Sequence, residues 1–242
     1  MTKSSCIVTC EFDMTEYARL FTYEDVGENT CAVTGYVGPE AASLLIPAKD
    51  PEGRTVVAIG DRAFSGCSFL RAVTLPDSLE TVGRRAFAFC TGLLDVRTSA
   101  ESRLSAIGDR AFMGCERLTV LRLGRLHSLT SLGRSAFAYC TRLRSVVLPE
   151  GMTELAPAAF EGCAALEHIH LPETLTAIRT AAFSACKSLR VLTLPASLRV
   201  IEDCAFAWCG RLTDLRLPES ACVISGSAFM ECFALADVLK VG

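Results

Sequence analysis

The chain has 242 residues, of which half are hydrophobic and 21% are charged. This balance allows a large buried core and excludes a disordered chain. The formal net charge of −3 argues against a dedicated nucleic-acid binder. No apolar run approaches the roughly 18 residues that a membrane span needs. The first ten residues contain one lysine and no long hydrophobic stretch, so we recognise no signal peptide and expect a cytoplasmic protein. The cell surface or the periplasm is the alternative.

Residues 1–58 are predicted to form a strand-rich N-terminal cap. The run from Thr22 to Cys31 has strand-forming residues around a Gly and Asn turn, which predicts a β-hairpin. Pro51 and Gly53 mark a turn between two apolar runs. The remaining residues, 59–242, follow a different pattern.

Cysteine positions reveal that pattern. The chain holds 13 cysteines, an odd number, and no Cys-x-x-Cys, so complete internal pairing is impossible and the commonest structural zinc half-site is missing. Eight of the cysteines end the same word, Ala-Phe-x-x-Cys, at intervals of 23 or 25 residues. Such a period predicts a repeat array over residues 59–242. The eight are Cys67, Cys90, Cys115, Cys140, Cys163, Cys186, Cys209 and Cys232.

Each unit is predicted to hold one short strand and several tight turns. Leu-x-x-Leu-x-Leu alternates in its second half, as a strand with one buried face does, and a proline such as Pro172 or Pro195 ends the strand. Leu-x-x-Ile and Ala-Phe-x-x-Cys are spaced by three, which fits tight turns or single helical turns. One unit cannot bury its own apolar edge, so neighbouring units must stack and share a core.

Two departures from the consensus are informative. Glycine follows the Ile or Val position early in the array, as at Gly83, but Ala156 and Arg179 replace it later, so we predict that this turn needs no positive φ. The two 25-residue units replace Leu-Pro by longer segments, which we expect to bulge outward after the strand. These segments are residues 97–102 and 123–127.

The word Leu-Pro-x-x-Leu-x-x-Ile-Gly-x-x-Ala-Phe-x-x-Cys resembles the BspA-like class of leucine-rich repeats, known from bacteria including spirochaetes. The resemblance covers residues 59 to about 239, and the lead-in through Phe21, Tyr36 and Pro47 is similar to the cap of such arrays. It implies an α/β fold: a right-handed leucine-rich-repeat solenoid with a parallel β-sheet on its concave face. Short turns, 3-10 helices or single-turn helices are expected on the convex face, and a β-hairpin in the cap. The resemblance also implies protein–protein or matrix adhesion, usually after secretion.

We interpret the repeat cysteines as a buried ladder of small, free thiols. Regular disulfide pairing is disfavoured because equivalent side chains of stacked strands point in parallel. Five cysteines lie outside the repeat position and are less constrained, and Cys6 and Cys10 among them could pair in an oxidising compartment. The other three are Cys31, Cys204 and Cys222.

No catalytic or cofactor-binding motif is recognisable, so we predict a protein that is not an enzyme and needs no cofactor. His168 and His170 lie two apart on a predicted strand and face the same side, which could hold a metal ion. No third ligand is identifiable nearby, so we interpret these residues, with His127, as surface histidines and predict no metal site.

Outward positions of the predicted strands are the candidate partner-binding surface, because repeat scaffolds commonly bind along such a face. Arginine is enriched at interface hot spots, and valines add apolar area. The candidates are Asp95, Arg97, Val120, Arg122, Val147, His168, His170, Val191, Arg216 and Asp214.

We therefore predict a non-enzymatic module that binds a protein partner through the concave strand face. No nucleic acid and no membrane span are expected. The alternatives are a self-associating structural protein, that is a homo-oligomer joined through its uncapped C-terminal edge, and a surface adhesin.

Overall fold

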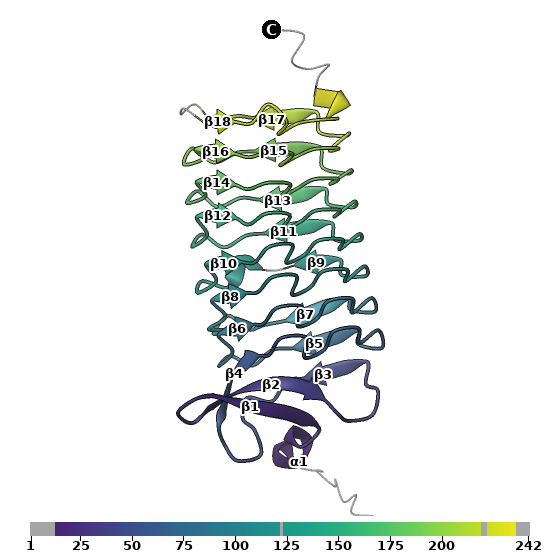
Figure 1. The fold of residues 1–242 in the computed structure, drawn as a ribbon, viewed down its shortest axis with the longest axis vertical. Coiled ribbons are helices and arrows are strands. Elements are labelled where there is room, and N and C mark those ends of the chain that lie inside the picture. Colours follow the sequence, from purple (N-terminus) through teal and green to yellow (C-terminus); the bar gives the residue numbers. More distant parts are fainter. Residues whose placement is uncertain (1–12, 122, 219–221, 236–242) are drawn as a thin grey trace, which may run out of the picture.

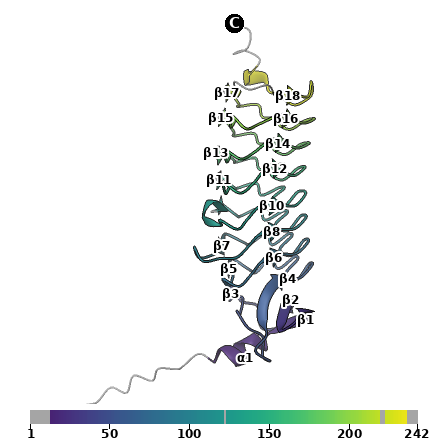
Figure 2. The ribbon, with the colours of Figure 1, turned by 90° about the vertical axis from the view of Figure 1, so that its left-hand side faces the viewer.

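The computed structural model describes residues 13–121, 123–218 and 222–235 of the chain (Figure 1). Within these ranges the chain winds into stacked turns along one long axis, as Figures 1 and 2 show. Each turn of the array contributes a short strand to a first row and a second short strand to a second row. Among the described residues, no helix has the length and apolar character needed to cross a membrane.

The first row arises from the Leu-x-x-Leu-x-Leu pattern. In β5, Val73 points into the core while Ala72 and Thr74 on either side are partly exposed, as a period of two requires. The row consists of β3 (Ser43–Leu45), β5 (Ala72–Thr74), β7 (Asp95–Arg97), β9 (Val120–Leu121), β11 (Ser145–Val147), β13 (His168–His170), β15 (Val191–Thr193) and β17 (Asp214–Arg216).

The second row lies where sequence patterning predicted turns or single helical turns. The Leu-x-x-Ile segment is extended at its end, with Thr81 exposed and Val82 buried. Stacking brings the same backbone groups of neighbouring turns within hydrogen-bonding distance, and pairing satisfies them. The row consists of β4 (Thr55–Ile59), β6 (Thr81–Val82), β8 (Ala106–Ile107), β10 (Ser131–Leu132), β12 (Glu154–Leu155), β14 (Ala177–Ile178), β16 (Val200–Ile201) and β18 (Val223–Ile224).

Pairing within both rows is parallel, as the solenoid fold predicts, but the rows are not continuous. The first row divides into the sheets β3-β5-β7, β9-β11-β13 and β15-β17. The second divides between β10 and β12. A 3-10 helix, η1 (Leu123–Arg125), falls in the second of the two longer units.

The N-terminal cap contains the predicted β-hairpin. β1 (Phe21–Gly27) pairs antiparallel with β2 (Thr30–Tyr36), and β2 pairs parallel with β4. The cap therefore extends the second row and covers the first turn of the array. A short helix, α1 (Met14–Ala18), precedes the hairpin. The proposed boundary between residues 58 and 59 falls inside β4 and stays a prediction.

A stack of phenylalanine rings runs through the core. The Ala-Phe-x-x-Cys phenylalanines from Phe64 to Phe229 stack in order, with centroid separations of 5.1–5.7 Å and interplanar angles of 2–13°. Phe21 of the cap packs edge-on against Phe64 and closes the near end. The predicted inward phenylalanines are thus confirmed and form one continuous column.

The repeat cysteines line the same core as free thiols. From Cys90 onward, each Sγ donates to the carbonyl oxygen of the phenylalanine one turn earlier, at 3.0–3.3 Å. Cys67, in the first unit, is only partly buried. The thiol is small enough for the core and also joins adjacent turns. Cys6 and Cys10 lie outside the described residues.

The glycines that follow the Ile or Val position in the early units allow neighbouring turns of the solenoid to approach closely, and they do not adopt unusual φ angles. None of Gly60, Gly83, Gly108 and Gly133 has a positive φ, as predicted. A Cβ on Gly83 would lie 2.7 Å from the carbonyl oxygen of Ile59 in the preceding turn. Positive φ occurs elsewhere in the unit, including the residue before each cysteine.

Candidate partner-binding surface

The predicted outward residues form two rows across the first row of strands. Parallel register aligns Asp95 with Ala72 and Arg97 with Thr74. Further along, it aligns Val147 with His170. We call this surface the strand face; its described candidate residues are Asp95, Arg97, Val120, Val147, His168, His170, Val191, Asp214 and Arg216. Arg122 lies outside the described residues.

Exposed valines give the strand face its apolar area. Val120, Val147 and Val191 expose 46%, 44% and 50% of their surface. Val120 is paired with Ser145, Val147 with His170 and Val191 with Asp214 of the following turns, so polar residues separate the valines along each row. The distribution provides separate apolar contact points rather than one patch.

The arginines of the strand face are not the free donors that the sequence suggested. The Arg97 Nε donates to Asp95 Oδ2 at 2.7 Å, and the Arg216 Nε lies 3.9 Å from Asp214 Oδ1. Residues two apart on a strand share a face, so these pairs form within one strand. The face therefore carries paired charges of both signs.

A hollow of the strand face lies where the first row of strands is interrupted. Among the described residues, no strand pairing and no backbone hydrogen bond joins β7 to β9. A hollow of about 690 Å³ lies there. It is lined by Leu94, Asp95, Val96, Arg97, Thr98, Ser99, Ala100, Thr119, Val120 and Arg125.

The two longer units explain the position of this hollow. Residues 97–100 supply one wall at and after the end of β7, and Arg125 of η1 supplies another. The insertions signalled an irregularity in the sequence, but Ser99 and Arg125 were not among the predicted site residues. Only the folded arrangement shows that both insertions border one space.

The family model described as "BspA type Leucine rich repeat region (6 copies)" matches residues 51–163 and residues 105–236 of this chain. The chain belongs to this family. A search of curated proteins finds no match.

Solved structures of other leucine-rich repeat proteins agree with the fold. A leucine-rich repeat protein of T. pallidum is 28% identical, with a TM-score of 0.73 over 93% of this chain and 92% of that chain. One from Bacteroides ovatus is 31% identical, with a TM-score of 0.73 over 83% of this chain and 52% of that one. The chain thus spans about half of the second structure.

Histidines of this BspA-type protein lie on the surface, as expected. His168 and His170 both project outward from β13, and His127 is also exposed. The His170 Nε2 lies 3.7 Å from Glu150 Oε1. Among the residues that the structure describes, no three His, Cys, Asp or Glu side chains are grouped to hold a metal ion.

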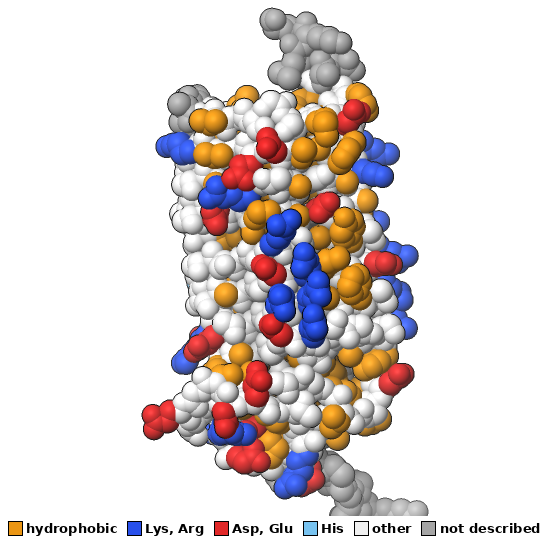
Figure 3. All heavy atoms as spheres, viewed as in Figure 1, with side chains coloured by type: hydrophobic (Ala, Val, Ile, Leu, Met, Phe, Trp, Pro, Cys, Tyr) orange, Lys and Arg blue, Asp and Glu red, His pale blue; other side chains and the backbone are white. Residues whose placement is uncertain are grey.

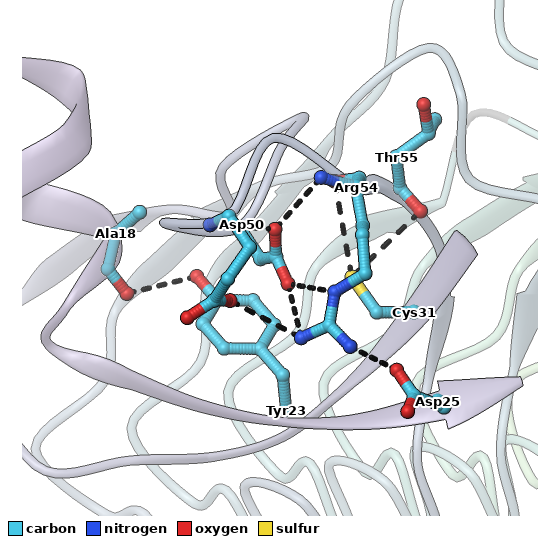
Figure 4. A network of polar contacts seen from close by, with 8 residues as sticks. Ala18, Tyr23, Asp25, Cys31, Asp50, Arg54 and Thr55 are labelled. Carbon is cyan, nitrogen blue, oxygen red and sulfur yellow. Dashed lines mark hydrogen bonds and ion pairs between the residues drawn. The ribbon is translucent and has the colours of Figure 1, made fainter. Parts of the chain in front are cut away.

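A polar network in the cap of this BspA-type solenoid was not predicted (Figure 4). The buried Asp50 accepts hydrogen bonds from the Arg54 N–H at 2.8 Å and from the Arg54 Nε at 2.6 Å, and Arg54 also pairs with Asp25. The Tyr23 hydroxyl donates to the Ala18 carbonyl at 2.8 Å. These contacts tie the hairpin to the turn at residues 50–54.

The Cys31 thiol beside this network is a poor nucleophile. Burial, with the Asp50 charge as a second cause, raises the pKa of Cys31 to about 11. A thiolate is the reactive form of cysteine, and a raised pKa disfavours it. We therefore assign the network a structural role at the N-terminal end of the core.

Proposed function

We propose that this protein is a non-enzymatic interaction module that binds a partner protein through the strand face. The observation that carries the proposal is the hollow between β7 and β9, bordered by Asp95, Arg97 and Val120, three predicted contact residues. The family and fold support an interaction or structural role in general. The partner and the use of this face are our inference.

The physical case rests on how interfaces are built. Specific interfaces combine a desolvated apolar centre with a polar rim. Val120 lies at the hollow, and Val147 follows on the next strand of the same sheet. The Asp95–Arg97 pair at the edge of the hollow offers both an acceptor and donors to polar groups of a partner. A partner protein that presents a protruding apolar side chain surrounded by polar groups would fit this surface.

The chemistry of the buried thiols supports the non-enzymatic part of the proposal. Burial raises the pKa of Cys90 to about 12 and that of Cys115 well above its ordinary value. Both thiols donate to carbonyl oxygens inside the core. They are placed to stabilise the solenoid rather than to attack a substrate.

A charge-reversal experiment tests the strand face. Val147→Asp and the triple change of Arg97, Arg122 and Arg216 to Glu should abolish crosslinked capture of a partner from the source cell extract. Stability should change little, since exposed substitutions usually alter it by about 0.5 kcal/mol or less each. Val26→Asp is the matched control, because Val26 on β1 exposes 48% of its surface, close to Val147. If the same partner binds both strand-face variants and wild type equally, the strand face is not the binding surface.

A second candidate function is self-association through the last described turn. Val223 exposes 72% of its surface, Phe233 68% and Leu217 51%. Apolar side chains exposed at a solenoid end favour contact with another surface. Light scattering over a concentration series tests this: a mass that rises with concentration in wild type and not in Val223→Asp supports it. A constant monomer mass rejects it.

A further inference from the structure

Two exposed aromatic rings lie on a surface separate from the strand face. The residue before each repeat cysteine has a positive φ, and in three turns it is aromatic: Phe89, Tyr139 and Trp208. Phe89 and Tyr139 have φ of 59° and 61°. These side chains expose 51% and 46% of their surface. A large aromatic side chain in this conformation is uncommon, since glycine is favoured there.

Both rings adopt the same pose over a glycine of the next turn. A Cβ built on Gly114 would meet Cδ1, Cε1 and Cγ of Phe89 at 2.7, 3.1 and 3.6 Å. A Cβ on Gly162 would meet the same three atoms of Tyr139 at 2.6, 3.0 and 3.5 Å. Each ring therefore rests where only glycine leaves room, and about half of it stays open. The Tyr139 hydroxyl also contacts Glu161 Oε1 at 3.3 Å.

The spacing of the two rings follows from the solenoid. The buried phenylalanines of these turns stack at 5.1 and 5.2 Å, so a given position recurs about 10 Å further on after two turns. Phe89 and Tyr139 hold the same position two turns apart. The surface thus presents two open rings that are two turns apart, with Gly114 between them.

Arginines accompany the rings in these turns. Arg62, Arg85 and Arg110 share one position of three successive turns, which backbone hydrogen bonds align. Within the described part of the chain, no ion pair involves these three guanidinium groups, whereas the Nε of the neighbouring Arg84 lies 3.7 Å from Asp61 Oδ2. Arg84 and Arg134 occupy the position just before, in alternate turns. Figure 3 shows Lys and Arg side chains gathered in the middle of one face, with hydrophobic side chains beside them.

Carboxylates near the arginines only partly offset this charge. Asp61 accepts from the backbone N–H of Arg84 at 2.7 Å and Asp109 from that of Arg134 at 2.8 Å, so these two carboxylates lie among the five arginines and leave a net positive charge. Glu116 lies two residues after Gly114, and Glu161 directly precedes Gly162. Guanidinium groups one turn apart repel one another, and an anion bound between them would relieve that repulsion.

The combination of rings and arginines spans the turns from Arg62 to Tyr139 and is not a consequence of the repeat. At the position of Arg62, Arg85 and Arg110, the later turns carry Ser135, Ala158, Ala181 and Cys204 with the same positive φ. Arginine is therefore not required by the backbone there.

We propose that this surface, formed by Phe89, Tyr139 and the arginines at 62, 84, 85, 110 and 134, binds a linear β-1,4-linked acidic glycan. Sugar rings stack on open aromatic faces, and guanidinium groups bind carboxylates through paired donors. A β-1,4-linked pyranose advances by close to one turn of this solenoid per residue and reverses its face at each residue. The carboxylates of successive sugars therefore point to opposite edges of the chain, so every second carboxylate faces the arginines, and every second sugar presents the same face to a ring.

An acidic peptide fits the same surface less well. An extended peptide advances about 3.3 Å per residue, so its side chains fall out of step with turns spaced by 5.1–5.2 Å. Peptide anchors also require pockets for individual side chains, whereas the two rings with Gly114 between them form an open platform. The spacing thus favours the glycan.

Calorimetric titration with three probes tests the assignment. A β-1,4-linked mannuronate oligomer should bind, and binding should weaken as salt increases. A cello-oligosaccharide of equal length, which has the same linkage without charge, and poly-aspartate should bind at least about tenfold more weakly, the equivalent of one lost good contact. Equal binding of the neutral sugar, tighter binding of poly-aspartate or no binding of the mannuronate oligomer would overturn the proposal.

Matched variants locate the site. Phe89→Ala and Tyr139→Ala should each weaken mannuronate binding about tenfold, as loss of a stacking platform does. Arg85→Ser and Arg110→Ser, which copy the serine at 135, should do the same. Trp208→Ala is the control, because Trp208 has the same position and 51% exposure but lies outside the arginine turns. Val147→Asp should leave glycan binding unchanged, which separates this site from the strand face. A Trp208→Ala loss as large as that of Phe89→Ala would refute the location.

Discussion

Phe160→Ala tests whether the ring column holds the array together. Phe160 is fully buried and stacks between Phe137 at 5.6 Å and Phe183 at 5.7 Å. Replacing it by alanine removes both ring contacts and leaves a cavity in the middle of the solenoid. Adjacent turns are hydrogen-bonded on both sides, so the cavity has little freedom to close.

Burial sets the expected magnitude. Truncation of a buried phenylalanine to alanine costs about 3–5 kcal/mol of unfolding free energy, including the cavity term. For a chain of this length, each kcal/mol shifts the melting temperature by about 2–4 °C. We therefore expect the Phe160→Ala midpoint to fall by about 6–20 °C. Because each repeat contacts only its neighbours, the loss can also split the transition into two.

Scanning calorimetry and urea unfolding followed by circular dichroism measure both effects. Phe89→Ala is the matched control, since it removes the same side chain from a position that is 51% exposed. The control should melt close to wild type. If Phe160→Ala melted no lower than Phe89→Ala, the stacked rings would not be the main source of cohesion between turns.

Two further predictions concern the thiols and the cap. Titration of unfolded, non-reduced protein should count at least the eight repeat cysteines as free, since they face the core as thiols; a majority found oxidised in fresh protein would contradict the buried ladder. Burial raises the pKa of Asp50, but hydrogen bonds from Arg54 outweigh it and hold the pKa below its ordinary value. A depressed carboxyl pKa stabilises the fold above the unfolded-state value of about 3.9, and this contribution is lost as pH falls through the folded-state value. Acid unfolding curves should therefore show a stability component that Asp50→Asn lacks, and identical pH profiles of the two proteins would exclude it.

Local patterns were sufficient to predict much of the fold. The spacing of Ala-Phe-x-x-Cys defines a unit too small to bury its own apolar edge, which requires stacking, and the inward Phe160 and Cys163 follow from that. Alternation around Val73 likewise predicts a strand with two outward residues. These features depend only on the residue pattern within one repeat unit, and that pattern recurs at the same positions in each unit.

Local sequence patterns did not predict the contacts between turns. The second row of strands arises because stacking aligns backbone groups at Thr81 and its equivalents, an effect of the spacing between turns. The Asp95–Arg97 pair shows the same limit, since a row of outward arginines in the sequence does not reveal which donors are already engaged.

The amino-acid sequence by itself determined the repeat, the identity of the core residues and the direction in which the strand residues point, because periodicity in a stacked array leaves one apolar side to bury. The tertiary structure decided where the sheet is interrupted between β7 and β9, which residues border the resulting hollow, and that Phe89 and Tyr139 lie in the same pose two turns apart. Those features depend on how residues more than twenty positions apart meet, and the residue types at each position do not specify that distance.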